Sequence, residues 1–124
     1  MDLHHFDSFD AYADAILDTG ARVFLLGSRD GGWRAGQRDV DGIDVQHGIA
    51  AVPNLCESVG WPSRLTLLLS QPSPSQTWLN GVPFDRGSLG IVAPGKGFVF
   101  RAAGPNEWIS IAVPAGSALF SGCL

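Results

Sequence analysis

The chain has 124 residues, which is enough for one domain of ordinary size. Charged residues make up only 16% of it, against about a quarter in typical soluble domains, and it contains 16 glycines and 8 prolines. A formal net charge of −4 argues against nucleic acid as a direct partner, because such binding needs a basic surface. The composition disfavours disorder, coiled coils and helical bundles, and it favours short strands joined by tight turns.

One helix is predicted near the N-terminus, over about residues 8–19. Asp7 or Ser8 can act as its N-cap, and Gly20 stands just past its end. Apolar residues recur at helical spacing between these ends, at Phe9, Ala13, Ile16 and Leu17. An amphipathic helix of this kind usually covers the face or the open edge of a sheet.

From about residue 21 to residue 114 the apolar pattern changes to a period of two, which indicates a β-barrel or sandwich. Strands are predicted at 22–26, 33–39, 42–52, 64–70, 77–79, 82–84, 88–93, 98–102 and 108–113. Asp41-Gly42 and Asn80-Gly81 are hairpin signals, and Pro94-Gly95 fits the centre of a type II turn. No linker divides the chain, so residues 1–124 are expected to form a single domain.

Two faces can be assigned within the predicted strand at 42–52. Its apolar face carries His47 among aliphatic residues, and the opposite face carries Asp44, Gln46 and Gly48. His47 is therefore a candidate polar group on an otherwise apolar face, although a satisfied core histidine is the alternative.

The sequence contains no pattern that predicts catalysis or metal binding. No nucleophile elbow or catalytic triad order is present, and the Asp39–Asp44 run lacks the order of a calcium loop. No second histidine stands two residues after His47 to share a metal ion with it. His4 and His5 are adjacent, so on an extended chain their side chains point in opposite directions and cannot bind one metal ion together. Cys56 could meet His47 as a thiolate pair, but a buried, inert cysteine is the favoured interpretation. No catalytic residue, metal ligand or cofactor is predicted.

Cys56 and Cys123 lie too far apart to indicate a disulfide framework or a Cys-x-x-Cys motif. The N-terminus lacks the features of a signal peptide, and the longest apolar runs are far shorter than a membrane span. A cytoplasmic domain with no membrane partner is therefore expected.

The aromatic content favours an interior that binds a small molecule. A barrel of about eight strands can hold one ligand among aromatic side chains with a few orienting polar groups. The predicted ligand-binding residues are Trp33, His47, Arg64, Trp78, Phe98, Phe100 and Trp108. Plain core packing is the alternative for each aromatic residue, and a solvated surface position is the alternative for Arg64.

Three segments carry a resemblance to a known family: 76–84, with Gln-Thr-Trp-Leu-Asn-Gly-Val-Pro-Phe; 89–95, with Leu-Gly-Ile-Val-Ala-Pro-Gly; and 108–114, with Trp-Ile-Ser-Ile-Ala-Val-Pro. Together with the predicted helix and the Gly32-Trp33 pair, this ordered set resembles the N-terminal domain of AraC-type transcription regulators. More narrowly, it is similar to the branch typified by ethanolamine-operon regulators. The resemblance covers the chain from about Phe6 to Val113.

The resemblance implies a mainly β fold, a cupin-like antiparallel β-barrel or jelly roll with one N-terminal α-helix. It also implies a domain that senses a small-molecule effector, forms a homodimer and has no catalysis of its own. In such regulators DNA is bound by a C-terminal pair of helix-turn-helix units, which are absent from these 124 residues. On this interpretation the chain is either the sensor half of a longer regulator or a protein that lost the other half.

Two other functions are compatible with the pattern. One is a small cupin enzyme, such as an isomerase or a metal-dependent oxygenase, although the His-x-His motif of metal-binding cupins is missing. The other is an interaction module whose exposed strand edge pairs with a partner.

Overall fold

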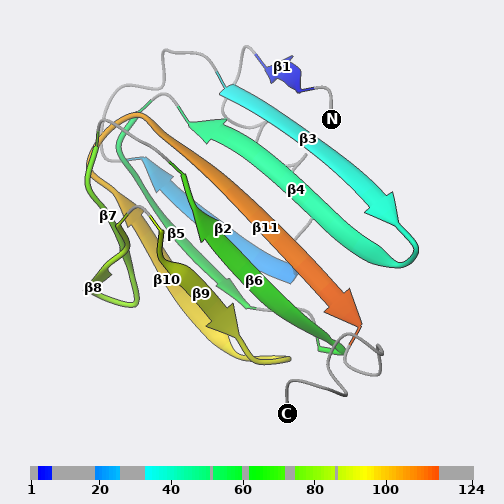
Figure 1. Cartoon of the computed structure of the whole chain (residues 1–124). Coiled ribbons are helices and arrows are strands. Elements are labelled where there is room, and N and C mark those ends of the chain that lie inside the picture. Colours follow the sequence, from blue (N-terminus) through cyan, green and yellow to red (C-terminus); the bar gives the residue numbers. More distant parts are fainter. Residues whose placement is uncertain are drawn as a thin grey trace.

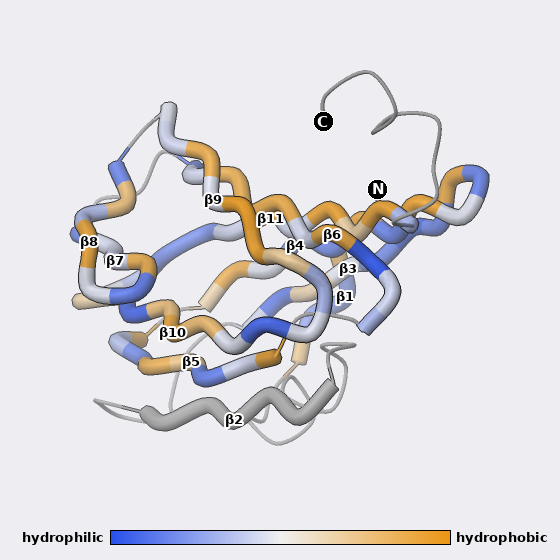
Figure 2. The backbone as a smooth tube through the Cα atoms, turned by 90° about the horizontal axis from the view of Figure 1, so that it is seen from below, coloured by the Kyte–Doolittle hydropathy of each residue, from blue (hydrophilic) through white to orange (hydrophobic). Residues whose placement is uncertain are grey.

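The computed structural model describes residues 3–6, 19–25, 33–50, 52–59, 62–71, 75–85 and 87–114, and within these ranges the regular structure is entirely β. Figure 1 shows the strands in two layers, and Figure 2 shows the same layers from below. The prediction of a mainly β, antiparallel fold is confirmed, in the form of two facing sheets. No helix in the described part of the chain is long and apolar enough to cross a membrane.

The larger sheet has six antiparallel strands. In spatial order they are β1 (His4–Phe6), β3 (Trp33–Val40), β4 (Ile43–Ala50), β11 (Asn106–Pro114), β6 (Arg64–Ser70) and β9 (Leu89–Val92). The last strand in the described part of the chain, β11, therefore lies between β4 and β6 and pairs with both over seven residues.

The smaller sheet has five antiparallel strands. Their spatial order is β2 (Thr19–Leu25), β5 (Asn54–Val59), β10 (Gly97–Ala102), β7 (Thr77–Leu79) and β8 (Val82–Pro83). It forms the second layer in Figure 2, below the six-stranded sheet.

The two predicted hairpins form because their turn residues tolerate left-handed backbone. Asp41 and Gly42 have φ of 53° and 82°, as a type I′ turn requires, and they join β3 to β4. Asn80 and Gly81 have φ of 51° and 79° and join β7 to β8 in the same way. Both hairpin predictions are confirmed.

The predicted turn at Pro94-Gly95 is also present. Gly95 has a φ of 73°, and the Lys96 N–H donates to the carbonyl of Ala93 at 3.1 Å. These are the features of a type II turn with glycine at its third position.

Two clusters of buried apolar residues form the core. The first contains Trp33, Ala35, Ala50 and Val52, with Phe6 and Trp108 packed against it. The second contains Leu68, Phe84, Val92 and Phe98, with Leu79 and Phe100 packed against it. The second cluster joins the two sheets, because Leu68 and Val92 come from β6 and β9 of the larger sheet and Leu79, Phe98 and Phe100 come from β7 and β10 of the smaller one.

The structure differs from the sequence prediction in its strands. Strands β1 and β5 are not among the predicted strands. Gly20, expected just past the helix, lies inside β2, where the pairing with β5 is irregular between Thr19 and Arg22. The predicted helix lies outside the described residues, apart from Thr19.

Candidate ligand-binding site

The inner face of the six-stranded sheet is polar where β4 crosses it. Alternate residues of β4 are buried, and the buried set includes Asp44 and Gln46, which are 4% and 6% exposed. The intervening apolar residues of β4 are only half-buried, so the polar side of this strand is the one that faces the interior. This reverses the usual arrangement of a half-buried strand.

Asp44 is held by two amide side chains. The Gln37 Nε2 donates to one carboxylate oxygen at 2.7 Å, and the Gln46 Nε2 donates to the other at 3.4 Å. A buried carboxylate needs such donors, because its desolvation is costly when it is unpaired. The two amides fix the carboxylate on the inner face.

Two hydroxyl groups share this face with Asp44. Ala112 of β11 pairs with Asp44 on one side and with Thr66 of β6 on the other, so the three side chains form one row across three strands. In the adjacent row Ser110 pairs with Gln46. We call Gln37, Asp44, Gln46, Thr66 and Ser110 the inner polar cluster.

Thr66 has an unmet hydrogen-bonding requirement. Its hydroxyl oxygen is buried and has no hydrogen-bond partner. Nearly all buried polar groups in proteins are satisfied by protein or by ordered water, so such a group needs an explanation. A ligand or a water molecule seated beside Asp44 and Ser110 would supply the missing bond.

The inner polar cluster lies between members of the two apolar core clusters. On one side, the row of Gly48 and Trp108 follows the row of Gln46 and Ser110. A Cβ atom added to Gly48 would lie 2.2 Å from Cζ2 of Trp108, so the indole ring lies directly over this glycine. On the other side, Leu68 pairs with Ser110 and belongs to the second core cluster.

Five of the seven predicted ligand-binding residues lie on inward-facing positions. Trp33 and Trp108 belong to the first core cluster, and Phe98 and Phe100 belong to the second. Arg64 begins β6 on the same face as Thr66 and pairs with Pro114. The structure therefore divides these residues between two places and does not gather them around one point.

The other two predicted residues lie on outer faces. Trp78 pairs with Arg101 on the side of the smaller sheet away from the core, and the guanidinium carbon lies 4.7 Å from the centre of the indole ring. His47 lies on the half-buried side of β4, opposite Asp44 and Gln46. The expectation that the apolar face of this strand points inward is wrong, because alternation groups residues by face without saying which face is covered.

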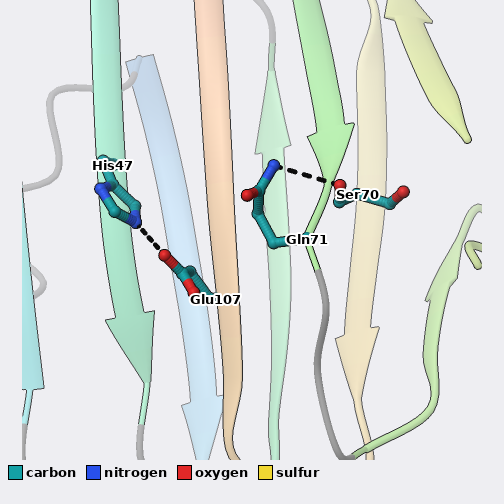
Figure 3. A network of polar contacts seen from close by, with 4 residues as sticks. All are labelled: His47, Ser70, Gln71 and Glu107. Carbon is teal, nitrogen blue, oxygen red and sulfur yellow. Dashed lines mark hydrogen bonds and ion pairs between the residues drawn. The ribbon is translucent and has the colours of Figure 1, made fainter. Parts of the chain in front are cut away.

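His47 has a close partner on this outer face. Its Nε2 lies 2.5 Å from a carboxylate oxygen of Glu107 on the neighbouring strand, as Figure 3 shows. Gly36 stands opposite His47 on β3. The same figure shows Gln71 folding back so that its amide donates to the carbonyl of Ser70 at 3.1 Å. Cys56 lies on β5 in the other sheet and so is not on a strand next to His47.

The inner polar cluster is not among the sites that the sequence predicts, although two of its members, Asp44 and Gln46, fall on one face of the predicted strand at 42–52. The alternation over residues 42–52 places Asp44 with Gln46 on the face opposite His47, and no ligand-binding residue is predicted on that face. Within the described ranges no three His, Cys, Asp or Glu side chains gather closely enough to hold a metal ion, and Asp44 is the only such residue in the cluster. The cluster is suited to hydrogen bonding with a small polar molecule.

Comparison with known proteins identifies the fold. No family model matches the sequence, and no curated protein matches it either. Among solved structures, an RmlC-like cupin from Shewanella frigidimarina NCIMB 400 aligns over 96% of this chain and 99% of its own, with 12% identity and a TM-score of 0.52. The plu4264 protein of Photorhabdus luminescens aligns over 70% and 79%, with 12% identity and a TM-score of 0.51.

A third similar structure is the cupin domain of Cnp3 from Schizosaccharomyces pombe. It covers 73% of this chain and 69% of its own, with 8% identity and a TM-score of 0.50. At these identities the likeness concerns the fold alone. The chain has a cupin-like fold, as the sequence predicted.

Proposed function

We propose that this cupin-like domain senses a small-molecule effector as the N-terminal regulatory domain of an AraC-type transcription regulator. It has no catalysis of its own, it acts as a homodimer, and DNA is bound through a separate helix-turn-helix domain. The ordered sequence motifs and the cupin-like fold support this proposal. The observation that carries the sensing function is the buried Thr66 hydroxyl, which lacks a partner and lies in the same row as the fixed Asp44 carboxylate, two strands away.

The chemistry of the inner polar cluster limits what the effector is. Asp44 accepts hydrogen bonds, and the Thr66 and Ser110 hydroxyls can both donate and accept. A small polar molecule that donates one more hydrogen bond to Asp44 and exchanges another with Thr66 fits this cluster. The indole of Trp108, two positions before Ser110, supplies an adjacent apolar wall.

Sensing follows from differential affinity. A ligand that binds one arrangement of the two sheets better than another shifts the population towards that arrangement. In the intact regulator this shift changes how the DNA-binding units are presented. Asp44 and Thr66 are suited to report the ligand because β4 and β6 flank the central strand β11.

The test is a thermal-shift screen of polar metabolites at millimolar concentration on the full chain. We expect at least one compound to raise the melting temperature, and we expect Asp44→Asn and Thr66→Val to abolish that shift. His47→Ala and Trp78→Ala are the controls, because both side chains lie on outer faces, and they should keep it. If no compound binds, or if the controls lose binding as the cluster variants do, the sensing site is refuted.

The regulatory part of the proposal has its own test. We expect the reading frame after Leu124 to continue into a basic segment with two helix-turn-helix units. A continuation into an unrelated fold would contradict the assignment to AraC-type regulators while leaving the sensing site standing.

A further inference from the structure

A row of side chains on the inner face of the six-stranded sheet joins two acids to the unpartnered hydroxyl of Thr66. Asp39 of β3 pairs with Asp44 of β4, and Ala112 of β11 pairs with Asp44 on one side and with Thr66 on the other. Residues paired across neighbouring strands point to the same face, so these four side chains lie in line. We call Asp39, Asp44, Ala112 and Thr66 the acidic row.

The two carboxylates of the acidic row stand directly opposite each other. Side chains at such positions have Cβ atoms about 4.5–5.5 Å apart, and like charges there are destabilising. Asp44 is only 4% exposed, so little water screens its charge, whereas Asp39 is exposed. The hydrogen bonds that they accept come from neutral donors: two amide side chains for Asp44, and the backbone N–H of Gly42 at 3.0 Å for Asp39. These donors leave both negative charges uncompensated.

Within the described part of the chain, neither acid forms an ion pair with a basic side chain. Arg64 lies on the same face of β6, two residues before Thr66, but it does not contact Asp39 or Asp44. His4, exposed on β1, lies four residue positions further along the sheet. The described inward positions of β5, β7 and β10 carry no charged side chain. Around the acidic row, two negative charges therefore stand against one positive charge.

The polar ends of the acidic row are too far apart for one monatomic ion to bind both. Asp44 and Thr66 belong to the strands on either side of β11, so their backbones are about 9.6 Å apart at the usual spacing of neighbouring strands. Cation–oxygen bonds are only about 2.5 Å long. Thr66 is 6% exposed and its hydroxyl oxygen has no partner, while the side chain between the two ends is the single methyl group of Ala112. A molecule with two polar ends fits this spacing.

We propose that the inner polar cluster binds a small organic cation. Its ammonium group donates to Asp44 within the field of Asp39, and a short chain carries a second polar group that exchanges a hydrogen bond with Thr66. Ammonium N–H groups match carboxylate oxygens, which only accept hydrogen bonds, and the ligand supplies the missing positive charge. A neutral molecule of the same shape leaves the buried charge uncompensated. This inference rests on the sensing site of the proposed function and adds the charge of its ligand.

Three compounds of equal length and different charge test the proposal: aminopropanol, propanediol and hydroxypropanoate, each with its two functional groups at opposite ends of three carbons. Two-dimensional NMR titration of the full chain at neutral pH measures each dissociation constant. Aminopropanol should bind at least ~10-fold more tightly than propanediol, because hydrogen bonds between charged groups are stronger than neutral ones. Hydroxypropanoate should not bind. Asp44→Asn should abolish the preference for aminopropanol.

Asp39→Asn separates charge from hydrogen bonding, because the amide keeps an oxygen that accepts from Gly42. It should weaken the binding of aminopropanol about 2- to 5-fold and leave that of propanediol unchanged. Asp85→Asn is the matched control. Asp85 is also an exposed carboxylate that accepts a hydrogen bond, from the Gln76 amide at 3.0 Å, but it follows β8 of the other sheet. This variant should bind all three compounds as the wild type does, and the NMR spectrum of each variant checks that it is folded.

The inference is overturned if propanediol or hydroxypropanoate binds as tightly as aminopropanol, or if aminopropanol does not bind. It is also overturned if Asp85→Asn weakens binding as much as Asp39→Asn does. The thermal-shift screen reads the sensing site separately. A neutral or anionic metabolite whose thermal shift depends on Asp44 and Thr66 would refute the cation and leave the sensing site standing, whereas both fail if no compound binds in either experiment.

Discussion

We expect Gly48→Ala to destabilise the protein, although the backbone conformation at Gly48 is one that alanine can adopt. The glycine lies in β4 and has no positive φ, so an alanine there carries no backbone strain. The added Cβ would lie 2.2 Å and 2.3 Å from Cζ2 and Cε2 of Trp108. Carbon atoms prefer a separation of about 3.5–4.0 Å, so the indole ring has to move by more than ~1 Å.

The ring has little room to move, because Trp108 packs against the first core cluster, in which Trp33 is fully buried. Overpacking of this kind costs about 1–3 kcal/mol. Replacing glycine by alanine also lowers the conformational entropy of the unfolded chain, which stabilises the folded protein by about 0.4–1 kcal/mol. We therefore expect Gly48→Ala to lower the free energy of unfolding by about 1–2 kcal/mol.

Urea denaturation followed by far-UV circular dichroism measures this change without relying on tryptophan fluorescence. Gly97→Ala is the matched control: it is also a strand glycine without positive φ, and the nearest atom to its Cβ would be a Ser58 oxygen at 3.7 Å. That variant should be neutral or slightly stabilising. In a Trp108→Leu background the cost of Gly48→Ala should fall. The contact with the indole ring would be refuted if Gly48→Ala and Gly97→Ala had the same free energy of unfolding. It would also be refuted if Gly48→Ala destabilised the Trp108→Leu variant as much as the wild type.

Three further predictions concern single sites. Thr66→Val removes a buried hydroxyl without a partner and should raise the free energy of unfolding by up to about 1 kcal/mol in the ligand-free protein; a loss of stability would mean that the hydroxyl is satisfied. Gly81→Ala should cost about 1 kcal/mol in urea denaturation, since φ is 79° and nothing else lies near the new Cβ, and an unchanged stability would contradict the turn. A double-mutant cycle with His47→Gln and Glu107→Gln should give a coupling below about 1 kcal/mol, because both side chains are partly exposed; a larger value would indicate a desolvated pair.

The turns could be predicted from sequence because their causes are local. Asn80-Gly81 needs only residues that adopt positive φ, and the two residues carry that tendency with them. The side-chain oxygen of Asn80 then accepts a hydrogen bond from the backbone N–H of Val99 at 2.9 Å. The backbone N–H of Asn80 donates to the Val99 carbonyl at 2.8 Å. This attachment of the hairpin to β10 joins residues nineteen positions apart, and no local pattern predicts it.

The position of the candidate site could not be predicted, because it depends on which side of β4 is covered. Alternation places Asp44 with Gln46 and His47 with Val45, and this grouping is correct. The interior was then assigned to the apolar group, whereas the buried group is the polar one. The same reversal occurs in β5, in which the buried residues, Asn54 and Ser58, are polar.

The place of β11 in the sheet has a consequence for how the protein folds. This strand is the last of the eleven that the structure describes, yet β4 and β6 both pair with it and not with each other. Until residues 106–114 leave the ribosome, β4 and β6 each present an unpaired edge, and the row from Asp44 to Thr66 does not exist. Such late, long-range closure predicts slow folding and a window during synthesis in which exposed strand edges favour association with other chains.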